Sequence, residues 1–259
     1  MGFNKKEFYA LASEIVEKNN IMNFLSIVTM NISLSPNCLM LLYKQDKGTR
    51  TVCGKKAWEG FGRAIKEDAE TYGMRSPKIS RKDGKWVCDY EYIGVIDARS
   101  TAGGAFRPKP SPKKLSDMLV ARTNRTIELV APDRLEDRMS GAEYNTERDV
   151  FYVSSKLNEA GRHAAIIKTY IKFYLSEKGV QDTMLESAIA YILLEQYDLN
   201  MHSRSYKGGM FKDLTEKDEN GKDKFTGEQK YQFLCRVVDT SRKIMEELNC
   251  EFLTYEETA

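Results

Sequence analysis

A proline-rich segment, Arg107-Pro-Lys-Pro-Ser-Pro-Lys-Lys114, limits more than any other feature how this chain of 259 residues can fold. Three prolines within five residues each remove a backbone donor and fix φ, so neither a helix nor a central strand can pass through the segment. An extended connection is expected instead, and Gly103-Gly104 just before it strengthens the break. We therefore predict two domains, at residues 1–106 and 115–259, joined by a linker at 107–114.

The linker also divides the charge of the chain. The whole sequence has 40 Lys and Arg against 38 Asp and Glu, and its net charge of +2 does not by itself suggest a nucleic-acid partner. Residues 1–114, however, hold 20 of the basic and 12 of the acidic side chains, a net charge of +8, which leaves −6 for residues 115–259. A role in nucleic-acid binding is therefore confined to the first domain, and the acidic second domain needs another explanation.

Hydrophobic periodicity and turn residues predict the α+β fold class. The first domain is predicted to be small and mixed, with helices at 8–15, 21–30 and 37–43, strands at 51–53 and 86–97, and a hairpin turn at 82–85. The second is predicted to be mainly helical with a small sheet, with strands at 126–130 and 150–153, helices at 156–176, 182–197 and 228–248, and a polar loop at 212–228.

Several functional classes lack their sequence signatures. The longest apolar runs fall far short of the roughly 20 residues that span a bilayer, so we expect no membrane contact. Five scattered cysteines without a C-x-x-C pair indicate reduced thiols in a cytoplasmic protein. Nucleophile-elbow, dinucleotide-binding and phosphate-loop motifs are missing, and His163 and His202 are the only histidines. We therefore expect no cofactor and no bound metal.

The clearest chemical signal is a run of cations between residues 44 and 66, interleaved with aromatic residues. Its members are Lys44, Lys47, Arg50, Lys55, Lys56, Arg63 and Lys66, against only Asp46 and Glu59. Phosphate-binding cations beside aromatic rings are typical of proteins that bind single-stranded nucleic acid. Two interpretations stay open: Tyr43 or Trp58 stacks on bases, or Trp58 and Phe61 belong to the core and the lysines form a solvated face.

Short motifs in this half of the chain resemble a known family. They are Asn37-Cys-Leu-Met-Leu-Leu-Tyr-Lys-Gln45, Thr51-Val-Cys-Gly-Lys-Lys-Ala-Trp58, Phe61-Gly-Arg63, Tyr92-Ile-Gly-Val-Ile-Asp97 and Ser100-Thr-Ala-Gly103. In this order they resemble the N-terminal domain of ArdC-type antirestriction proteins and their LtrC-like relatives. The resemblance implies single-stranded DNA as the partner and a mobile element or phage as the source. The implied nucleic-acid-binding residues are Tyr43, Lys44, Arg50, Lys55, Lys56, Trp58, Arg63 and Lys66. The segment 66–73 departs from the basic turn of the family.

The resemblance extends to the second domain, which is a zincin-like metallopeptidase in the relatives. Segments 141–144, 149–153 and 185–199 match that domain, and Lys168-Thr-Tyr-Ile-Lys172 stands where the relatives have His-Glu-x-x-His. Ammonium groups have no lone pair for a metal, and a threonine cannot replace the glutamate base. The resemblance thus implies a degenerate metal site made of Lys168, Thr169, Lys172 and Glu186, in which Glu186 neutralises a lysine.

Our leading hypothesis is a single-stranded DNA-binding, antirestriction-type protein whose second domain is a pseudo-peptidase and not an enzyme. A host defence protein is a second candidate partner. The alternative is an inhibitor of a host defence nuclease or other host factor that acts through the acidic second domain, with a merely structural first domain. A third hypothesis, an active peptidase with unusual ligands, requires replacements for both histidines and for the base.

Overall fold

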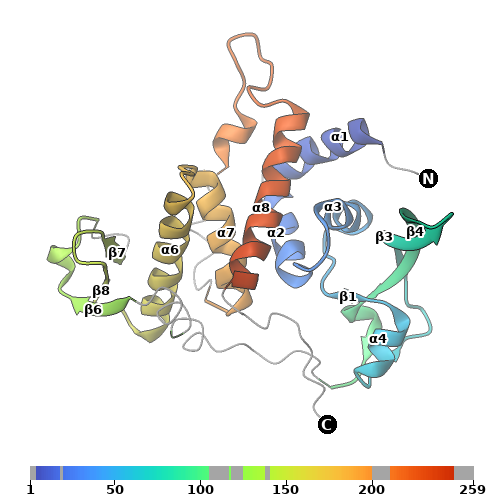
Figure 1. Cartoon of the computed structure of the whole chain (residues 1–259), viewed down its shortest axis with the longest axis horizontal. Coiled ribbons are helices and arrows are strands. Elements are labelled where there is room, and N and C mark those ends of the chain that lie inside the picture. Colours follow the sequence, from blue (N-terminus) through green and yellow to red (C-terminus); the bar gives the residue numbers. More distant parts are fainter. Residues whose placement is uncertain are drawn as a thin grey trace. The chain divides into compact units, whose positions relative to one another are not determined.

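The computed structural model describes residues 4–17, 20–104, 117, 125–137, 141–199 and 211–247 (Figure 1). The chain divides into two compact units: the first holds residues 1–108 and 217–234, and the second holds residues 109–216 and 235–259. The predicted linker at 107–114 lies outside the described residues.

The segment 217–234, which the sequence alone assigns to the second domain, groups with the first unit. It contains the first turns of helix α8 (Gly227–Glu247). The Tyr9 hydroxyl donates a hydrogen bond of 2.6 Å to Glu228, and the rings of Tyr9 and Tyr231 lie 5.5 Å apart. Contacts between residues so far apart in the sequence leave no trace in local periodicity, so the sequence pattern could not show them.

Three helices supply most of the core of the first unit: α1 (Lys5–Val16), α2 (Asn20–Met30) and α3 (Pro36–Gln45). The Asn4 side chain accepts from the Glu7 backbone N–H while the Glu7 carboxylate accepts from the Asn4 N–H, a reciprocal cap that starts α1. Ser35 caps α3, whose first residue is a proline. These helices confirm those predicted at 8–15, 21–30 and 37–43.

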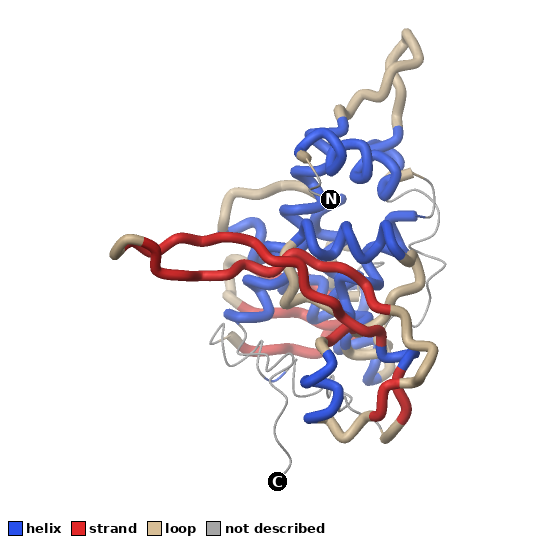
Figure 2. The backbone as a smooth tube through the Cα atoms, turned by 90° about the vertical axis from the view of Figure 1, so that its right-hand side faces the viewer, coloured by secondary structure: helices blue, strands red, loops and turns tan. Residues whose placement is uncertain are grey.

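The strands of the first unit form two small antiparallel sheets. One has the order β1-β4-β3, from β1 (Val52–Cys53), β4 (Lys85–Asp97) and β3 (Thr71–Lys82), and the other pairs β2 (Ala64–Ile65) with β5 (Thr101–Ala102). β3 and β4 form a long hairpin, and Figure 2 shows its strands running side by side out to their turn. Asp83 and Gly84 in the turn have φ of 48° and 75°, as a tight hairpin turn demands. The predicted turn at 82–85 and strands at 51–53 and 86–97 are confirmed.

The sequence patterns did not predict strand β3 or the six-residue helix α4 (Lys55–Gly60). β3 is an edge strand, since it pairs with β4 alone. Proline has no backbone N–H to donate, and an edge strand tolerates this at Pro77 because one of its sides has no partner strand. Among its described side chains, only Tyr72 and Met74 near its start are buried, so the strand shows little of the apolar alternation that marks a half-buried strand.

The second unit combines a three-stranded sheet with packed helices. Its elements are β6 (Thr126–Val130), β7 (Ala142–Asn145), β8 (Val150–Ser154), α6 (Glu159–Glu177), α7 (Thr183–Gln196) and the 235–247 part of α8. The strand order is β6-β8-β7, with β6 parallel and β7 antiparallel to β8. Helix α6 packs on α7 and on the sheet. The predicted α+β class is confirmed, and no helix in the described part of the chain is long and apolar enough to cross a membrane.

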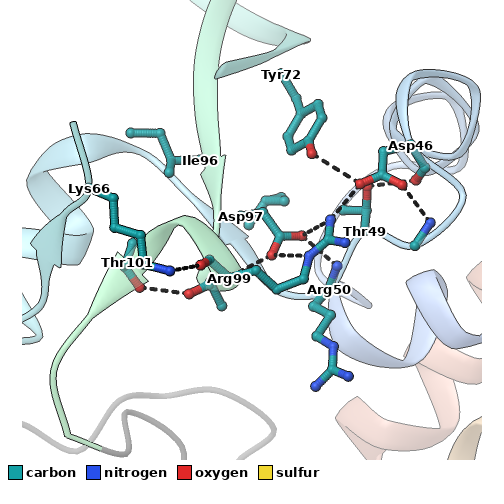
Figure 3. Close-up of polar contacts among 12 residues, drawn as sticks. Asp46, Thr49, Arg50, Lys66, Tyr72, Ile96, Asp97, Arg99 and Thr101 are labelled. Carbon is teal, nitrogen blue, oxygen red and sulfur yellow. Dashed lines mark hydrogen bonds and ion pairs between the residues drawn. The ribbon is translucent and has the colours of Figure 1, made fainter. Parts of the chain in front are cut away.

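The last residue of β4, Asp97, has a buried carboxylate that joins neighbouring segments of the first unit by hydrogen bonds. The Asp97 side chain is 1% exposed. One of its oxygens accepts from the backbone N–H and the Nε of Arg99 at 2.7 and 2.9 Å, and the other accepts from the Arg50 backbone N–H at 2.6 Å (Figure 3). A buried charge is tolerated only when it is paired and hydrogen-bonded. We call the group of Asp97, Arg99, Arg50 and Asp46 the Asp97 cluster.

Asp46, just after α3, ties that helix to the cluster. Its carboxylate accepts from the Arg99 guanidinium, from the Gly48 N–H at 2.7 Å and from the Tyr72 hydroxyl at 3.1 Å. Partial burial alone would raise the pKa of Asp46, but hydrogen bonds from Arg99, Gly48 and Tyr72 outweigh it and lower the pKa below its ordinary value. The bonds to Asp97 and then Asp46 raise the pKa of Arg99.

Asp97→Ala should destabilise the chain by about 3 kcal/mol, because it leaves the backbone N–H groups of Arg50 and Arg99 without their acceptor and removes one of the two carboxylates that pair with the Arg99 guanidinium. Asp97→Asn retains oxygen acceptors and should cost less than half as much. Urea unfolding followed by tryptophan fluorescence measures both effects, since both tryptophans lie in the first unit. The exposed Asp89 supplies the control variant Asp89→Ala. Equal stability of the Asp97→Ala and Asp89→Ala variants would contradict the role of the cluster.

Stability should also fall in acid through Asp46. Its pKa is lower in the folded than in the unfolded chain, so its contribution is complete above about pH 5 and is lost as the pH falls through the folded pKa. The Asp46→Asn variant should therefore be less stable than wild type at neutral pH and equally stable near pH 2. Free energies of unfolding measured against pH test this. A stability gap of constant size, or the same pattern in an Asp68→Asn control, would argue against it.

Candidate functional site

The two aromatic rings predicted to stack on bases are buried. Tyr43 and Trp58 both have 0% exposure. The Tyr43 ring meets Phe24 edge-on with centroids 6.3 Å apart, and the indole N–H of Trp58 donates to the Ile96 carbonyl at 2.8 Å. A base can stack only on an exposed ring face, so the predicted stacking role of Tyr43 and Trp58 is wrong. Of the two rings that the open alternative placed in the core, Trp58 is buried and Phe61 is half-buried.

Most of the predicted cations do lie on the surface of the first unit. The exposed ones are Lys44, Arg50, Lys55, Lys56 and Lys66. Figure 3 shows the Arg50 guanidinium pointing away from the Asp97 cluster, although the backbone N–H of the same residue binds Asp97. The cluster therefore fixes the backbone of Arg50 and leaves its charge outside. Lys55 faces Glu59 at 3.9 Å, a surface pair that holds its partners only weakly.

Arg63 has structural bonds that the sequence did not reveal. Its Nε donates to the Thr101 hydroxyl at 2.8 Å, and Nη1 donates to the carbonyls of Gly103, at 3.2 Å, and Gly104. Gly103 has a φ of 144°, and a Cβ there would lie 3.2 Å from the Gly62 carbonyl oxygen, so this close approach favours glycine. Arg63, which is half-buried, thus holds the backbone of residues 101–104. Its predicted phosphate contact competes with these bonds.

Exposed aromatic residues occur instead on the β3–β4 hairpin, outside the predicted site. Trp86 is 75% exposed, and Tyr90 and Tyr92 are 56% and 55% exposed. The predicted strand at 86–97 placed them in an extended segment. Strand alternation alone does not show which of its faces the core covers. The missing signal was the partner strand β3, whose register assigns the faces.

The degenerate metal site predicted for the second unit lies on two packed helices, α6 and α7 (Figure 1). Lys168 and Lys172 are exposed on successive turns of α6, whereas Thr169 is 8% exposed. Burial raises the pKa of Glu186 on α7, and the charge of Lys172 opposes that rise. Lys172 on α6 therefore acts on Glu186 through its charge. Lys168 is exposed, yet enough protein surrounds its ammonium group to lower its pKa by desolvation.

These side chains do not fit a resident divalent metal. Lysine ammonium groups offer no lone pair to a metal. The positive charge of Lys172 also acts on Glu186, the carboxylate that would have to bind the cation. His163 lies at the start of α6, with its Nε2 3.7 Å from Glu159. His202 is outside the described residues. Within the described ranges, no three His, Cys, Asp or Glu side chains gather in an arrangement that could hold a metal ion.

Comparison with known proteins identifies the fold. No family model matches the chain, and no curated protein matches its sequence. Among solved structures, the antirestriction protein ArdC of plasmid R388 in its Mn(II)-bound form aligns at 13% identity and a TM-score of 0.50, covering 97% of this chain and 100% of that one. The metal-free form aligns at 12% identity and a TM-score of 0.49, over 95% and 98%. The chain therefore has an ArdC-like fold over nearly its full length.

Proposed function

We propose that this chain is an antirestriction-type protein whose first domain binds single-stranded DNA. The observation that carries the proposal is the set of exposed cations on well-anchored elements of the first unit: Lys44, Arg50, Lys55, Lys56 and Lys66. The fold supports it, because the chain resembles a solved protein described as antirestriction. We retain two domains, at 1–106 and 115–259 with a linker at 107–114, for this division of roles.

Binding is electrostatic in this proposal. Each lysine or arginine that meets a phosphate releases counterions from the strand, which provides affinity without a choice of sequence. The Asp97 cluster fixes parts of two of these cations. Asp97 accepts a hydrogen bond from the Arg50 backbone N–H, and the Arg99 carbonyl accepts one of 2.8 Å from the Lys66 ammonium group. Their positions are thus set before the strand arrives, which reduces the entropy lost on binding.

We further propose that the second domain is a pseudo-peptidase. The support is chemical: the positions that would bind metal and activate water hold Lys168, Thr169 and Lys172, and the charge of Lys172 acts on the pKa of Glu186. No catalytic step is assigned to these residues. The net charge of −6 in residues 115–259 suits contact with a basic protein partner better than contact with DNA.

The first test is a salt titration of the binding of a fluorescent single-stranded oligonucleotide. If five cations each meet a phosphate, log K should fall against log [salt] with a slope of about −3.5. Lys56→Ala should make the slope shallower by about 0.7. Lys156→Ala removes an exposed charge from the second unit and serves as the control with an unchanged slope. No binding at low salt would refute the proposal and favour an inhibitor that acts through the acidic second domain.

The second test is metal content. The wild-type chain, incubated with zinc or manganese and then desalted, should retain no stoichiometric metal. The double variant Lys168→His with Lys172→His should retain about one zinc per chain, because two imidazoles four residues apart on a helix can join Glu186 as ligands. Adding Glu186→Gln should weaken that binding. Stoichiometric metal on the wild-type chain, or proteolysis that a chelator abolishes, would overturn the pseudo-peptidase assignment.

A further inference from the structure

The β3–β4 hairpin has two faces of different chemistry. Side chains that lie opposite each other in an antiparallel pair share a face, and neighbours along a strand alternate. The register pairs Arg75 with Tyr92 and Arg81 with Trp86, and Tyr90 is two residues from Tyr92. These five residues therefore share one face, which we call the arginine-aromatic face.

The opposite face of the hairpin carries its carboxylates. Glu91 pairs with Lys78 at 2.8 Å, and Asp89 lies 3.9 Å from Lys82. The register places these four residues on the face that, nearer the base of the hairpin, holds the buried Tyr72. With Lys85, which the register pairs with Lys82, that face carries three lysines against two carboxylates. On the arginine-aromatic face, the described charged side chains of the strands are Arg75 and Arg81, with no carboxylate beside them.

Several exposed aromatic rings on one surface indicate a binding site more than a single exposed ring does. Trp86, Tyr90 and Tyr92 each expose more than half of their surface. The Arg75 guanidinium lies 4.5 Å from the centre of the Tyr90 ring, a cation stacked on an aromatic face. Planar arginine, tyrosine and tryptophan groups are the ones on which unpaired bases stack.

We propose that the arginine-aromatic face of the β3–β4 hairpin is the surface on which single-stranded DNA stacks its bases. The inference rests on the proposed function of the first domain and supplies the aromatic contacts that the buried Tyr43 and Trp58 cannot make. From Trp86 to Tyr92 the strand spans about 20 Å, the length of roughly six stacked nucleotides. Charge complementarity selects this occupant, because a face whose only charges are positive suits a polyanion.

Tryptophan fluorescence gives a direct readout. The chain has two tryptophans, of which Trp58 is buried and Trp86 is 75% exposed, so quenching by an oligo-dT of about ten nucleotides reports on Trp86. Trp86→Phe should keep affinity within about threefold and abolish the quenching. Trp86→Ala should weaken binding about 10-fold or more, and Tyr90→Ala should act in the same direction.

Two adjacent cations on opposite faces provide a matched control. Arg81 and Lys82 are both exposed and differ in that Lys82 shares its face with Asp89. Arg81→Ala should weaken oligo-dT binding several-fold more than Lys82→Ala does. Equal losses would mean that only general charge matters, and would overturn the assignment of the face.

The outcomes separate this inference from the proposed function. If the wild-type chain binds oligo-dT with a steep salt dependence but Trp86 is not quenched and Trp86→Ala binds normally, the hairpin inference fails and the DNA-binding function stands. If the wild-type chain binds no oligo-dT at low salt, the proposed function itself fails. Concentration-dependent self-association that Trp86→Ala abolishes, without quenching by DNA, would assign the face to a protein contact and overturn the inference.

Discussion

The first unit depends on the satisfaction of one buried charge. Asp97 is nearly inaccessible to water, and each of its oxygens is held by donors that come from separate parts of the chain. The end of β4, the loop after α3 and the turn after Asp97 meet at this side chain. A buried carboxylate is tolerated only when it is paired and hydrogen-bonded, so Asp97 requires these segments to lie together. The exposed cations at 50 and 66 owe their positions to this requirement.

Trp58 is also held in the core by a hydrogen bond to the end of β4. Its indole N–H is bonded to the Ile96 carbonyl, one residue before Asp97, which ties α4 to the strand. A tryptophan buried for that purpose cannot also offer a ring face to a base. It does orient α4, whose first turn carries Lys55 and Lys56 outward. Trp58, which the sequence analysis predicted to stack on bases, therefore has a structural role: it positions the helix that carries Lys55 and Lys56.

The sequence predicts elements well where the core imposes a period. Helices α1 to α3 repeat their apolar residues, and α1 and α3 begin with recognisable caps, so periodicity located them. It failed at β3, which lies at a sheet edge and buries only Tyr72 and Met74 among its described side chains. At the site, residue type and spacing identified the cations. They could not tell a ring that faces inward, as Trp58 does, from one that faces outward, as Trp86 does, because that distinction depends on pairing with distant segments.

Strand β4 links both parts of the proposed DNA path. Its outer half carries Trp86, Tyr90 and Tyr92, and its end carries Asp97, which positions Arg50. The two surfaces contribute different kinds of free energy. Cations provide attraction that salt weakens, whereas stacking depends little on salt and acts only at contact. Single-stranded DNA that contacted both surfaces would be attracted by the cations and held by stacking on the aromatic rings. In the proposed interface the basic segment therefore supplies the attraction and the hairpin supplies the stacking surface.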